Sequence, residues 1–308
     1  MRHEKAGLKE EIRTILQTRY HIDPTELIFH PIGEESVSYI VKDESNKYLV
    51  KYRLDIHKLH SISQVNTLLF ELSHFPFIVA PLKTVDGKTE ILLPEGIMYV
   101  FPFIEGTLSD VPNPDFPKEL VHALTEIMIK VHNTRDLRSP VPKEEFKPWY
   151  RSIFEKILLL AKDHPQAIYA KIINANHSKI EKIITDHENQ AASLKKNPPP
   201  FVLTHGDITM FNFIESAQGV KLIDWDESMM GPKEFDLMFF VDNPHFDEKK
   251  YLSQTGQKEI DRALIQYYKD RWALDSIVKG LNDLATKELG AEDIKEKLRE
   301  VEEYLGYY

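Results

Sequence analysis

The sequence predicts an α+β fold in two lobes, a small one over residues 1–104 and a large one over residues 105–308. Apolar and polar residues alternate over 28–41, as in a β-hairpin, whereas apolar residues in the second half of the chain recur at helical spacing. Three prolines within 112–117 follow the last strand expected in the small lobe and mark the boundary. The small lobe is therefore expected to be mostly antiparallel sheet with helices, and the large lobe mostly helical.

The elements of the small lobe follow from local patterns. Leu8, Ile12, Ile15 and Leu16 recur at the spacing of an amphipathic helix. The expected elements are a helix at 6–20, a hairpin at 28–41, a strand at 46–53, a helix at 61–74 and a strand at 97–104 that leaves the lobe.

The large lobe begins with a clear helical pattern at 118–132, where Leu120, Leu124 and Met128 share one face. The run of prolines at 198–200 ends a later helix and leads into short apolar runs that are typical of buried strands. Helices are expected at 118–132, 149–163, 166–194, 259–285 and 291–305, and an acidic loop at 242–248.

Three side chains that can bind a metal or a proton, Asp207, Asn212 and Asp224, lie within 18 residues of one another. The apolar runs around them predict that they lie at the ends of buried strands. Desolvating a carboxylate costs several kcal/mol unless it is paired or bound to metal. These residues are therefore expected either to hold a cation or to lie at a strand end that faces a cleft; a local turn network with a strand-end cap is the alternative.

The spacing of the three residues is that of a phosphoryl-transfer site. In protein kinases a catalytic Asp is followed five positions later by an Asn, and a second Asp follows on the next hairpin. Here Asn212 follows Asp207 by five positions and Asp224 comes 12 residues later. The pattern predicts that Asp207 orients an attacking hydroxyl while Asn212 and Asp224 hold Mg²⁺ on the phosphates.

Two segments carry a family resemblance. His205-Gly-Asp-x₄-Asn212 and Ile223-Asp-Trp-Asp226, followed by the segment Gly231–Phe239, resemble the paired signatures of the aminoglycoside phosphotransferase and choline kinase superfamily. With Phe101–Gly106, they look most like its spectinomycin phosphotransferase branch. The resemblance implies a bilobal protein-kinase-like fold that uses ATP (or GTP) and Mg²⁺. It implies transfer of the γ-phosphoryl group to a hydroxyl of an aminoglycoside or aminocyclitol such as spectinomycin, an antibiotic-resistance activity.

The resemblance also implies nucleotide-binding residues. Lys51 would reach the phosphates from its strand, Ser36 would donate from the turn before it, and a purine edge would bond the Pro102 carbonyl and the Ile104 N–H. The turn at 33–36 has one glycine where the family often has several. An exposed strand lysine and a plain core strand are the alternatives for Lys51 and for 97–104.

The carboxylate partner of Lys51 is left open by the sequence. The family places a glutamate near position 64, which is Gln64 here, and Glu71 lies on the same helical face two turns later. His205 is expected to brace its loop rather than act as a base, and His132 is expected to be structural.

The acceptor site is predicted from one helix face. Tyr268, Trp272 and Asp275 share a face of the 259–285 helix, and such an aromatic and acidic face suits a cationic, hydroxylated ligand. Asp226 is a further candidate for binding a cationic substrate. Ordinary helix packing with a solvated Asp275 is the alternative.

Composition limits the function classes. The net charge of −10 and the pI near 5.7 argue against a nucleic-acid partner, because phosphate neutralisation needs a basic face. The charge suits a cationic small substrate, although many cytoplasmic proteins are simply acidic. The absence of cysteine excludes disulfides and thiolate sites. No apolar run reaches the ~18 residues of a membrane helix, and the start of the chain lacks an apolar signal core, so a cytoplasmic protein without a membrane partner is expected. The expected state is a monomer or a weak homodimer.

Two other functions stay open at this point. The same scaffold phosphorylates choline, homoserine, methylthioribose and similar metabolites, and acidic residues suit choline as well as an aminocyclitol. A nucleotide-binding pseudoenzyme that senses a small molecule is the third possibility. The complete set of Asp207, Asn212 and Asp224 argues against it.

Overall fold

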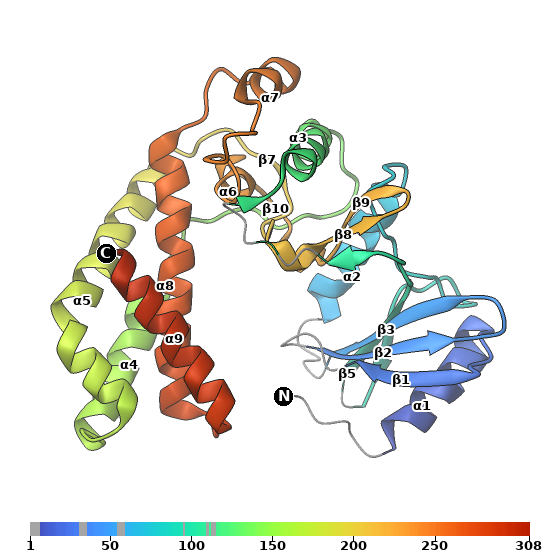
Figure 1. Cartoon of the computed structure of the whole chain (residues 1–308), viewed down its shortest axis with the longest axis horizontal. Helices are drawn as coiled ribbons and strands as arrows, with labels where there is room; N and C mark the ends of the chain where they lie inside the picture. The colour runs from blue at the N-terminus through green and yellow to red at the C-terminus, as the bar shows by residue number, and fades with distance from the viewer. Residues whose placement is uncertain (1–6, 31–35, 54–58, 95, 109–110, 112–114) are drawn as a thin grey trace. The chain divides into compact units, whose positions relative to one another are not determined.

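The structure is a computed structural model that describes residues 7–30, 36–53, 59–94, 96–108, 111 and 115–308 (Figure 1). The chain divides into two compact units, one of residues 1–143 with 202–257 and one of residues 144–201 with 258–308. The lobe boundary expected after residue 104 lies inside the first unit and stays a prediction. Residues 33–35 of the predicted phosphate-covering turn lie outside the described residues.

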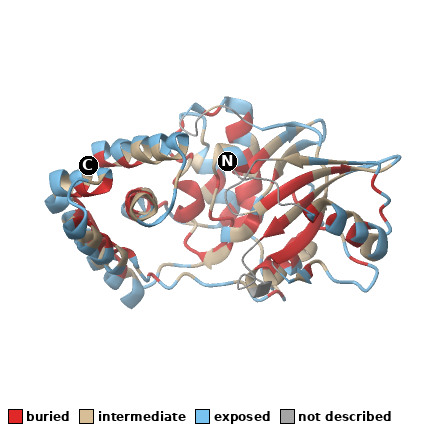
Figure 2. Cartoon of the chain, turned by 90° about the horizontal axis from the view of Figure 1, so that it is seen from below, coloured by how far each residue is buried: buried red, intermediate tan, exposed pale blue. Residues whose placement is uncertain are grey.

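In the described part of the chain, the N-terminal residues form a five-stranded antiparallel sheet in the order β1-β2-β3-β5-β4. The strands are β1 (Glu26–His30), β2 (Ser36–Lys42), β3 (Lys47–Arg53), β4 (Ile91–Leu93) and β5 (Gly96–Pro102). Alternate residues of β2 and β3, such as Tyr39, Val41 and Val50, are fully buried and pack in one core with helix α1 (Leu8–Ile15). Figure 2 shows the buried residues along these strands.

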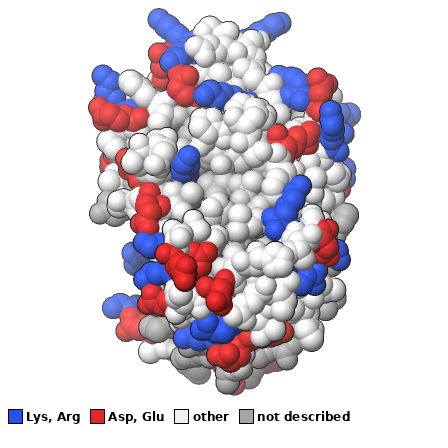
Figure 3. Space-filling view, turned by 90° about the vertical axis from the view of Figure 1, so that its right-hand side faces the viewer, with Lys and Arg blue, Asp and Glu red and all other residues white. Residues whose placement is uncertain are grey.

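The first predicted helix changes its winding halfway. It begins as α1 and continues as a five-residue π-helix, η1 (Leu16–Tyr20), which ends at His21 in the left-handed conformation with φ 55°. Helix α2 (Leu59–Glu71) covers the region predicted at 61–74. On the face drawn in Figure 3, acidic and basic side chains are interspersed.

The remainder of the first unit carries the predicted motif. Helix α3 (Lys118–His132) has the predicted bounds. Strand β7 (Val202–Thr204) pairs with β10 (Met229–Gly231), and β8 (Phe213–Ser216) forms a hairpin with β9 (Gly219–Leu222). The other elements are β6 (Thr107–Leu108), which pairs with β8, the 3₁₀ turns η4 (Met210–Asn212) and η5 (Trp225–Glu227), and the helices α6 (Glu234–Leu237) and α7 (Glu248–Thr255).

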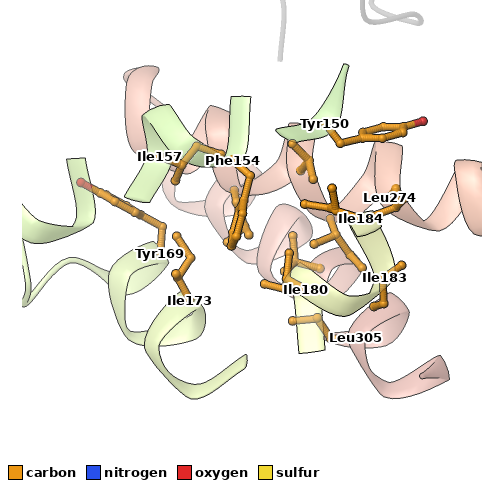
Figure 4. Packing of buried hydrophobic residues seen from close by; sticks show 14 of the residues in the cluster. Tyr150, Phe154, Ile157, Tyr169, Ile173, Ile180, Ile183, Ile184, Leu274 and Leu305 are labelled. Atoms are coloured by element: carbon orange, nitrogen blue, oxygen red, sulfur yellow. The ribbon is translucent and has the colours of Figure 1, made fainter. Parts of the chain in front are cut away.

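The second unit, all of whose residues are described, consists of helices around one apolar core (Figure 4). They are α4 (Tyr150–Asp163), α5 (Ile168–Lys196), α8 (Arg262–Thr286) and α9 (Ala291–Tyr307), close to the predicted ranges. Phe154, Ile157, Ile180, Ile184 and Leu274 are fully buried in this core. At about 1.5–3 kcal/mol for each buried apolar side chain, such a core holds the helices together.

The predicted α+β class, with an N-terminal sheet and a mostly helical C-terminal part, is confirmed. Helix α7 was not predicted, because its sequence begins in the acidic stretch expected as a loop. Asp247 caps it by accepting a hydrogen bond from the Lys250 N–H. None of the helices in the described part of the chain combines the length and apolarity that crossing a bilayer requires.

Candidate active site

The loop that carries Asp207 begins at the end of β7. Gly206 has a φ of 88°, which an L side chain rarely adopts, and a Cβ there would lie 2.5 Å from the carbonyl oxygen of Glu227. The glycine is therefore required both by the backbone conformation and by the close approach of the neighbouring chain.

Asp236 of α6 holds the backbone of this loop. Its Oδ2 accepts a hydrogen bond of 2.9 Å from the His205 N–H, and its Oδ1 accepts one of 2.7 Å from the Gly206 N–H. His132 Nε2 lies 3.0 Å from the same Oδ2, and the hydroxyl of Tyr251 lies 2.6 Å from His132 Nδ1. Helices α3, α6 and α7 thus meet in one buried polar network behind the loop.

His205 occupies a bracing position. Its Nε2 lies 3.0 Å from the carbonyl oxygen of Ile223, and the Asp207 N–H donates to its Nδ1 at 3.2 Å. The side chain is buried, and this burial lowers the pKa of His205 below its ordinary value. A neutral imidazole with both nitrogens in use supports the predicted structural role rather than that of a base.

Asp207 and Asn212 are in direct contact. The Asn212 side-chain amide donates a hydrogen bond of 2.6 Å to Oδ2 of Asp207 and one of 3.0 Å to the backbone carbonyl of Asp207. The second oxygen, Oδ1, is buried and accepts no hydrogen bond from the described residues. Burial raises the pKa of Asp207 to about 6, although the Asn212 hydrogen bond acts in the opposite direction. A carboxylate with one free oxygen and a raised pKa is suited to accept a proton.

Asp224 follows β9 on the neighbouring hairpin. The Ile223 N–H donates 2.8 Å to the Asn212 carbonyl, which ties the two loops together. Asp224 itself has φ 63° and ψ 63°, the left-handed conformation that Asn and Asp tolerate better than other non-glycine residues. The two predicted metal ligands therefore come from adjacent, mutually bonded segments.

Lys51 of β3 pairs with Asp224. Its Nζ lies 3.3 Å from Asp224 Oδ1, and the Asp224 side chain is 44% exposed. Burial works against the charge of Lys51, but Asp224 beside it raises the Lys51 pKa above its ordinary value, and Lys51 lowers that of Asp224 in turn. The open question of the carboxylate partner of Lys51 is thereby answered in this structure.

The helix glutamate considered for that role is used elsewhere. Glu71, near the end of α2, accepts hydrogen bonds of 2.8 and 3.0 Å from the N–H groups of Arg138 and Ser139 and one of 2.7 Å from the Ser139 hydroxyl. These bonds lower the Glu71 pKa despite the cost of burial. Glu71 thus fixes the loop after α3.

A second ion pair lies beside the first. Arg53, also on β3, pairs through Nη1 with Oδ2 of Asp226. The Asp226 side chain is 27% exposed and the Arg53 side chain 7% exposed. Asp226, a predicted substrate residue, therefore lies in an ion pair with the protein itself.

The predicted nucleotide residues lie on the same sheet. Ser36 is the first residue of β2, paired with Arg53, and Pro102 is the last residue of β5, paired with Tyr48. Beyond Pro102 the Phe103 N–H donates 3.0 Å to the Lys47 carbonyl, and Ile104 follows.

The predicted acceptor residues on α8 belong to the second unit. Trp272 Nε1 donates 3.0 Å to the Tyr304 hydroxyl, and Tyr268 is buried with its hydroxyl 3.4 Å from Glu144. Oδ1 of Asp275 lies 3.8 Å from Lys279 Nζ in an ion pair and accepts no hydrogen bond from the described residues, and burial raises the Asp275 pKa. The aromatic and acidic face exists, with much of its polar surface already paired within the unit.

Three residues of the site had no role assigned from the sequence. Asp236 lies in the matched segment Gly231–Phe239, and Tyr251 lies in the unpredicted helix α7. Arg53 could have been found from spacing, because Lys51 and Arg53 are two residues apart on a strand and Asp224 and Asp226 are two apart on the facing loop.

The residues present fit a magnesium ion. The described residues contain no cluster of three or more His, Asp or Glu that could hold a metal by itself. The amide nitrogen of Asn212 is engaged with Asp207, which leaves its oxygen, and the Asp224 carboxylate is partly exposed. Mg²⁺ in phosphoryl-transfer sites uses one or two such oxygen ligands and completes its shell with phosphates and water.

Comparisons with known proteins bear on the family and the fold. The model of the phosphotransferase enzyme family matches residues 26–277. A spectinomycin phosphotransferase solved with ADP and spectinomycin is 21% identical, with 96% of this chain and 93% of that chain covered and a TM-score of 0.72. A choline kinase from Streptococcus pneumoniae is 20% identical, with 98% of both chains covered and a TM-score of 0.60.

An amicoumacin kinase in complex with AMP-PNP and Ca²⁺ is 15% identical, with 97% of this chain and 93% of that chain covered and a TM-score of 0.62. No curated protein sequence matches the chain. The structural similarities confirm the predicted protein-kinase-like fold.

Proposed function

Because the chain belongs to the phosphotransferase enzyme family, we propose that it transfers the γ-phosphoryl group of ATP to a hydroxyl of an aminoglycoside or aminocyclitol such as spectinomycin. The family assignment confirms the broader prediction of an ATP-dependent phosphotransferase with an alcohol acceptor. The finer identity of the acceptor is the part that we propose.

The state of Asp207 carries the proposal. One carboxylate oxygen is fixed by Asn212, the other is buried without a partner, and the pKa is raised to about 6. A carboxylate with this pKa is ionised at neutral pH. Because its pKa is close to neutral, it is also basic enough to accept a proton from an attacking hydroxyl. Asp207 thus orients the acceptor hydroxyl and takes its proton as the phosphoryl group is transferred.

Asn212, Asp224 and Lys51 form the phosphate end of the site. Asn212 and Asp224 would hold Mg²⁺, which when bound neutralises negative charge on the phosphate oxygens. Lys51, held charged by Asp224, turns its ammonium group to the phosphates. Much of the rate gain in such a site comes from positioning and electrostatic stabilisation.

The base of the nucleotide would bind at the end of β5. The Pro102 carbonyl and the Ile104 N–H are offered to a purine edge, and Ser36 at the start of β2 donates to a phosphate. ATP is the proposed phosphoryl donor. GTP, which presents a different purine edge to the Pro102 carbonyl and the Ile104 N–H, is the alternative.

The acceptor is proposed to be cationic and hydroxylated. The net charge of −10 and the acidic and aromatic residues Asp275 and Trp272 support this. A metabolite kinase of the choline type is the second candidate, and the similarity in fold to a choline kinase favours it. A pseudoenzyme sensor is disfavoured because Asp207, Asn212 and Asp224 are all present and brought together.

The test is coupled nucleotide turnover with Mg²⁺ and either ATP or GTP. The acceptors are spectinomycin, a small aminoglycoside set, choline, homoserine and methylthioribose. Asp207→Asn is the inactivating variant, and Asp163→Asn, an exposed carboxylate at the end of α4, is its matched control.

Turnover stimulated by spectinomycin, lost by several powers of ten in Asp207→Asn and kept in Asp163→Asn, is the expected result. Stimulation by choline or another metabolite instead would retain the mechanism and replace the acceptor. Nucleotide binding without turnover on any acceptor would contradict the proposal and favour the sensor.

A further inference from the structure

Two ion pairs join β3 to the loop after β9, and they share one spacing. Lys51 and Arg53 are alternate residues of β3, so their side chains leave the same face of the strand. Asp224 and Asp226 are also two residues apart, and each meets one of these cations. The strand and the loop are thereby held by two parallel contacts rather than one.

The two pairs differ in how tightly they are made. Lys51 Nζ lies 3.3 Å from Asp224, with side chains that are 21% and 44% exposed. The Arg53–Asp226 pair is more buried, with side chains that are 7% and 27% exposed. A planar guanidinium also holds a carboxylate with more directional hydrogen bonds than an ammonium does. The Arg53–Asp226 pair is the tighter of the two.

The proposed chemistry breaks only one of these pairs. With nucleotide and metal bound, Lys51 would turn to the phosphates and Asp224 would hold the cation, so each would leave the other for a new partner. That scheme assigns the phosphates to Lys51 and the cation to Asp224, and it keeps the Arg53–Asp226 pair intact. The contact that keeps β3 at a fixed distance from the metal-binding loop during this exchange is therefore the second one.

No glutamate of α2 fills this role in the described residues. Position 64 is a glutamine, and the carboxylate of Glu71 is engaged by Arg138 and Ser139. A carboxylate from α2 is thus not what holds the lysine strand in place.

We propose that Arg53 and Asp226 form a positioning brace that holds Lys51 and Asp224 in register for nucleotide binding. The inference rests on the proposed function, since it assigns Lys51 to the phosphates and Asp224 to the metal. In this assignment Asp226 acts through Arg53 and does not contact the acceptor, in place of the substrate role that the sequence suggested.

The test uses the full chain and measures nucleotide binding apart from turnover. Arg53→Met, Arg53→Lys, Asp226→Asn, the double variant Arg53→Met with Asp226→Asn, and the exchanged pair Arg53→Asp with Asp226→Arg are compared. The dissociation constant of a fluorescent ATP analogue with Mg²⁺ is measured without acceptor, followed by the KM values for ATP and acceptor. Lys42→Met is the matched control, because Lys42 forms an exposed ion pair with Glu26 in the same sheet.

Arg53→Met and Asp226→Asn are each expected to weaken nucleotide binding by about 10- to 100-fold, as for other residues that orient a metal ligand. The double variant should be no weaker than the worse single variant, because both remove one interaction. Arg53→Lys should regain most of the affinity, and Lys42→Met should bind as the wild type does. The acceptor KM should stay unchanged throughout.

An Asp226→Asn variant that raises the acceptor KM alone would overturn the proposal, and so would unchanged nucleotide affinity in both single variants. If a single variant does not fold, as judged by circular dichroism, the exchanged pair decides. An exchanged pair that folds and binds nucleotide with near wild-type affinity supports the brace. An exchanged pair that folds but does not regain this affinity overturns the brace. If the wild-type protein binds nucleotide but turns over no acceptor, the proposed function is contradicted. Weaker nucleotide binding in the Arg53 and Asp226 variants would still support the brace in that case.

Discussion

The imidazole of His132 and the carboxylate of Asp236 lie 3.0 Å apart, and neither side chain is exposed to solvent. The same carboxylate accepts the N–H groups of His205 and Gly206, the two residues that precede Asp207. The position of the candidate base is therefore set by α3 and α6 through a buried hydrogen-bond network rather than by the loop alone. Such a network contributes rigidity only while every member is satisfied.

We expect Asp236→Asn to impair both activity and stability. The N–H groups of His205 and Gly206 each need an acceptor oxygen, and asparagine has only one. The amide –NH₂ of the asparagine would therefore face a buried N–H, which would lose its hydrogen bond. Unfolding by urea should show a loss of about 2–4 kcal/mol, and kcat should fall about 10- to 100-fold. The exposed Asp163→Asn should change neither, and an unchanged kcat in Asp236→Asn would contradict the positioning role.

Gly206 should tolerate no side chain. Gly206→Ala combines a left-handed φ with a Cβ 2.5 Å from the Glu227 carbonyl, so the loop must move and Asp207 with it. Gly219→Ala is the matched control, since Gly219 has φ 96° and nothing within 4 Å of an added Cβ. The control should cost about 1–2 kcal/mol of stability and keep turnover, whereas Gly206→Ala should lose most turnover. Equal effects of the two substitutions would refute this.

The charged side chain of Asp207 should lower the stability of the folded protein. Burial raises the Asp207 pKa to about 6, so its charged form at neutral pH is disfavoured relative to the unfolded chain. Asp207→Asn is therefore expected to stabilise the protein at pH 7.5 by about 2 kcal/mol while abolishing turnover. Thermal unfolding in EDTA without nucleotide measures this, and a lower melting temperature in the variant would disprove it.

His187 should make the second unit sensitive to acid. It is buried and stacks on Tyr267 with ring centroids 4.5 Å apart, and its Nδ1 has no partner among the described residues. Burial lowers the His187 pKa to about 4. Between pH 6.5 and 4 the unfolded chain binds the proton and the folded chain does not, so stability present above pH 6.5 is lost as pH falls.

His187→Phe should remove this loss and keep the stacking. The free energy of unfolding is measured at pH 7.5 and at pH 4.5 for both proteins. Its decrease between these two pH values should be smaller in His187→Phe than in the wild type by about 2–3 kcal/mol. His164→Phe, at an exposed histidine after α4, should retain the wild-type pH dependence. Parallel pH profiles for the wild type and His187→Phe would rule out the assignment.

Periodicity and motif spacing were sufficient for much of the fold. The bounds of α3 were predicted to the residue, and α4, α5 and α8 within a few residues, because their apolar faces are long and regular. Asp207, Asn212 and Asp224 were placed together because a five-residue spacing and two hairpins leave little freedom. Their roles, and those of Lys51, Ser36, Pro102 and Ile104, stay predictions.

Long-range pairing could not be predicted in the same way. That Lys51 meets Asp224 and Arg53 meets Asp226 depends on how β3 approaches a loop more than 170 residues later. The contact of Tyr251 with His132 depends on α7, whose polar sequence lacks a helical apolar face. The π-helical turn after α1 has no periodicity of its own, so the sequence predicted one continuous helix.

The left-handed backbone of Asp224 has an evolutionary consequence. Among residues with a side chain, asparagine is the closest substitute that tolerates this conformation, and it has the same shape but lacks the charge. A lineage that lost the need for catalysis would therefore be able to replace Asp224 with asparagine without rebuilding the loop. With Asp224 as the proposed metal ligand, the fold is one substitution away from a protein that keeps its architecture and gives up its proposed chemistry, and descendants of this kind are where a sensor of the same small molecules would be sought.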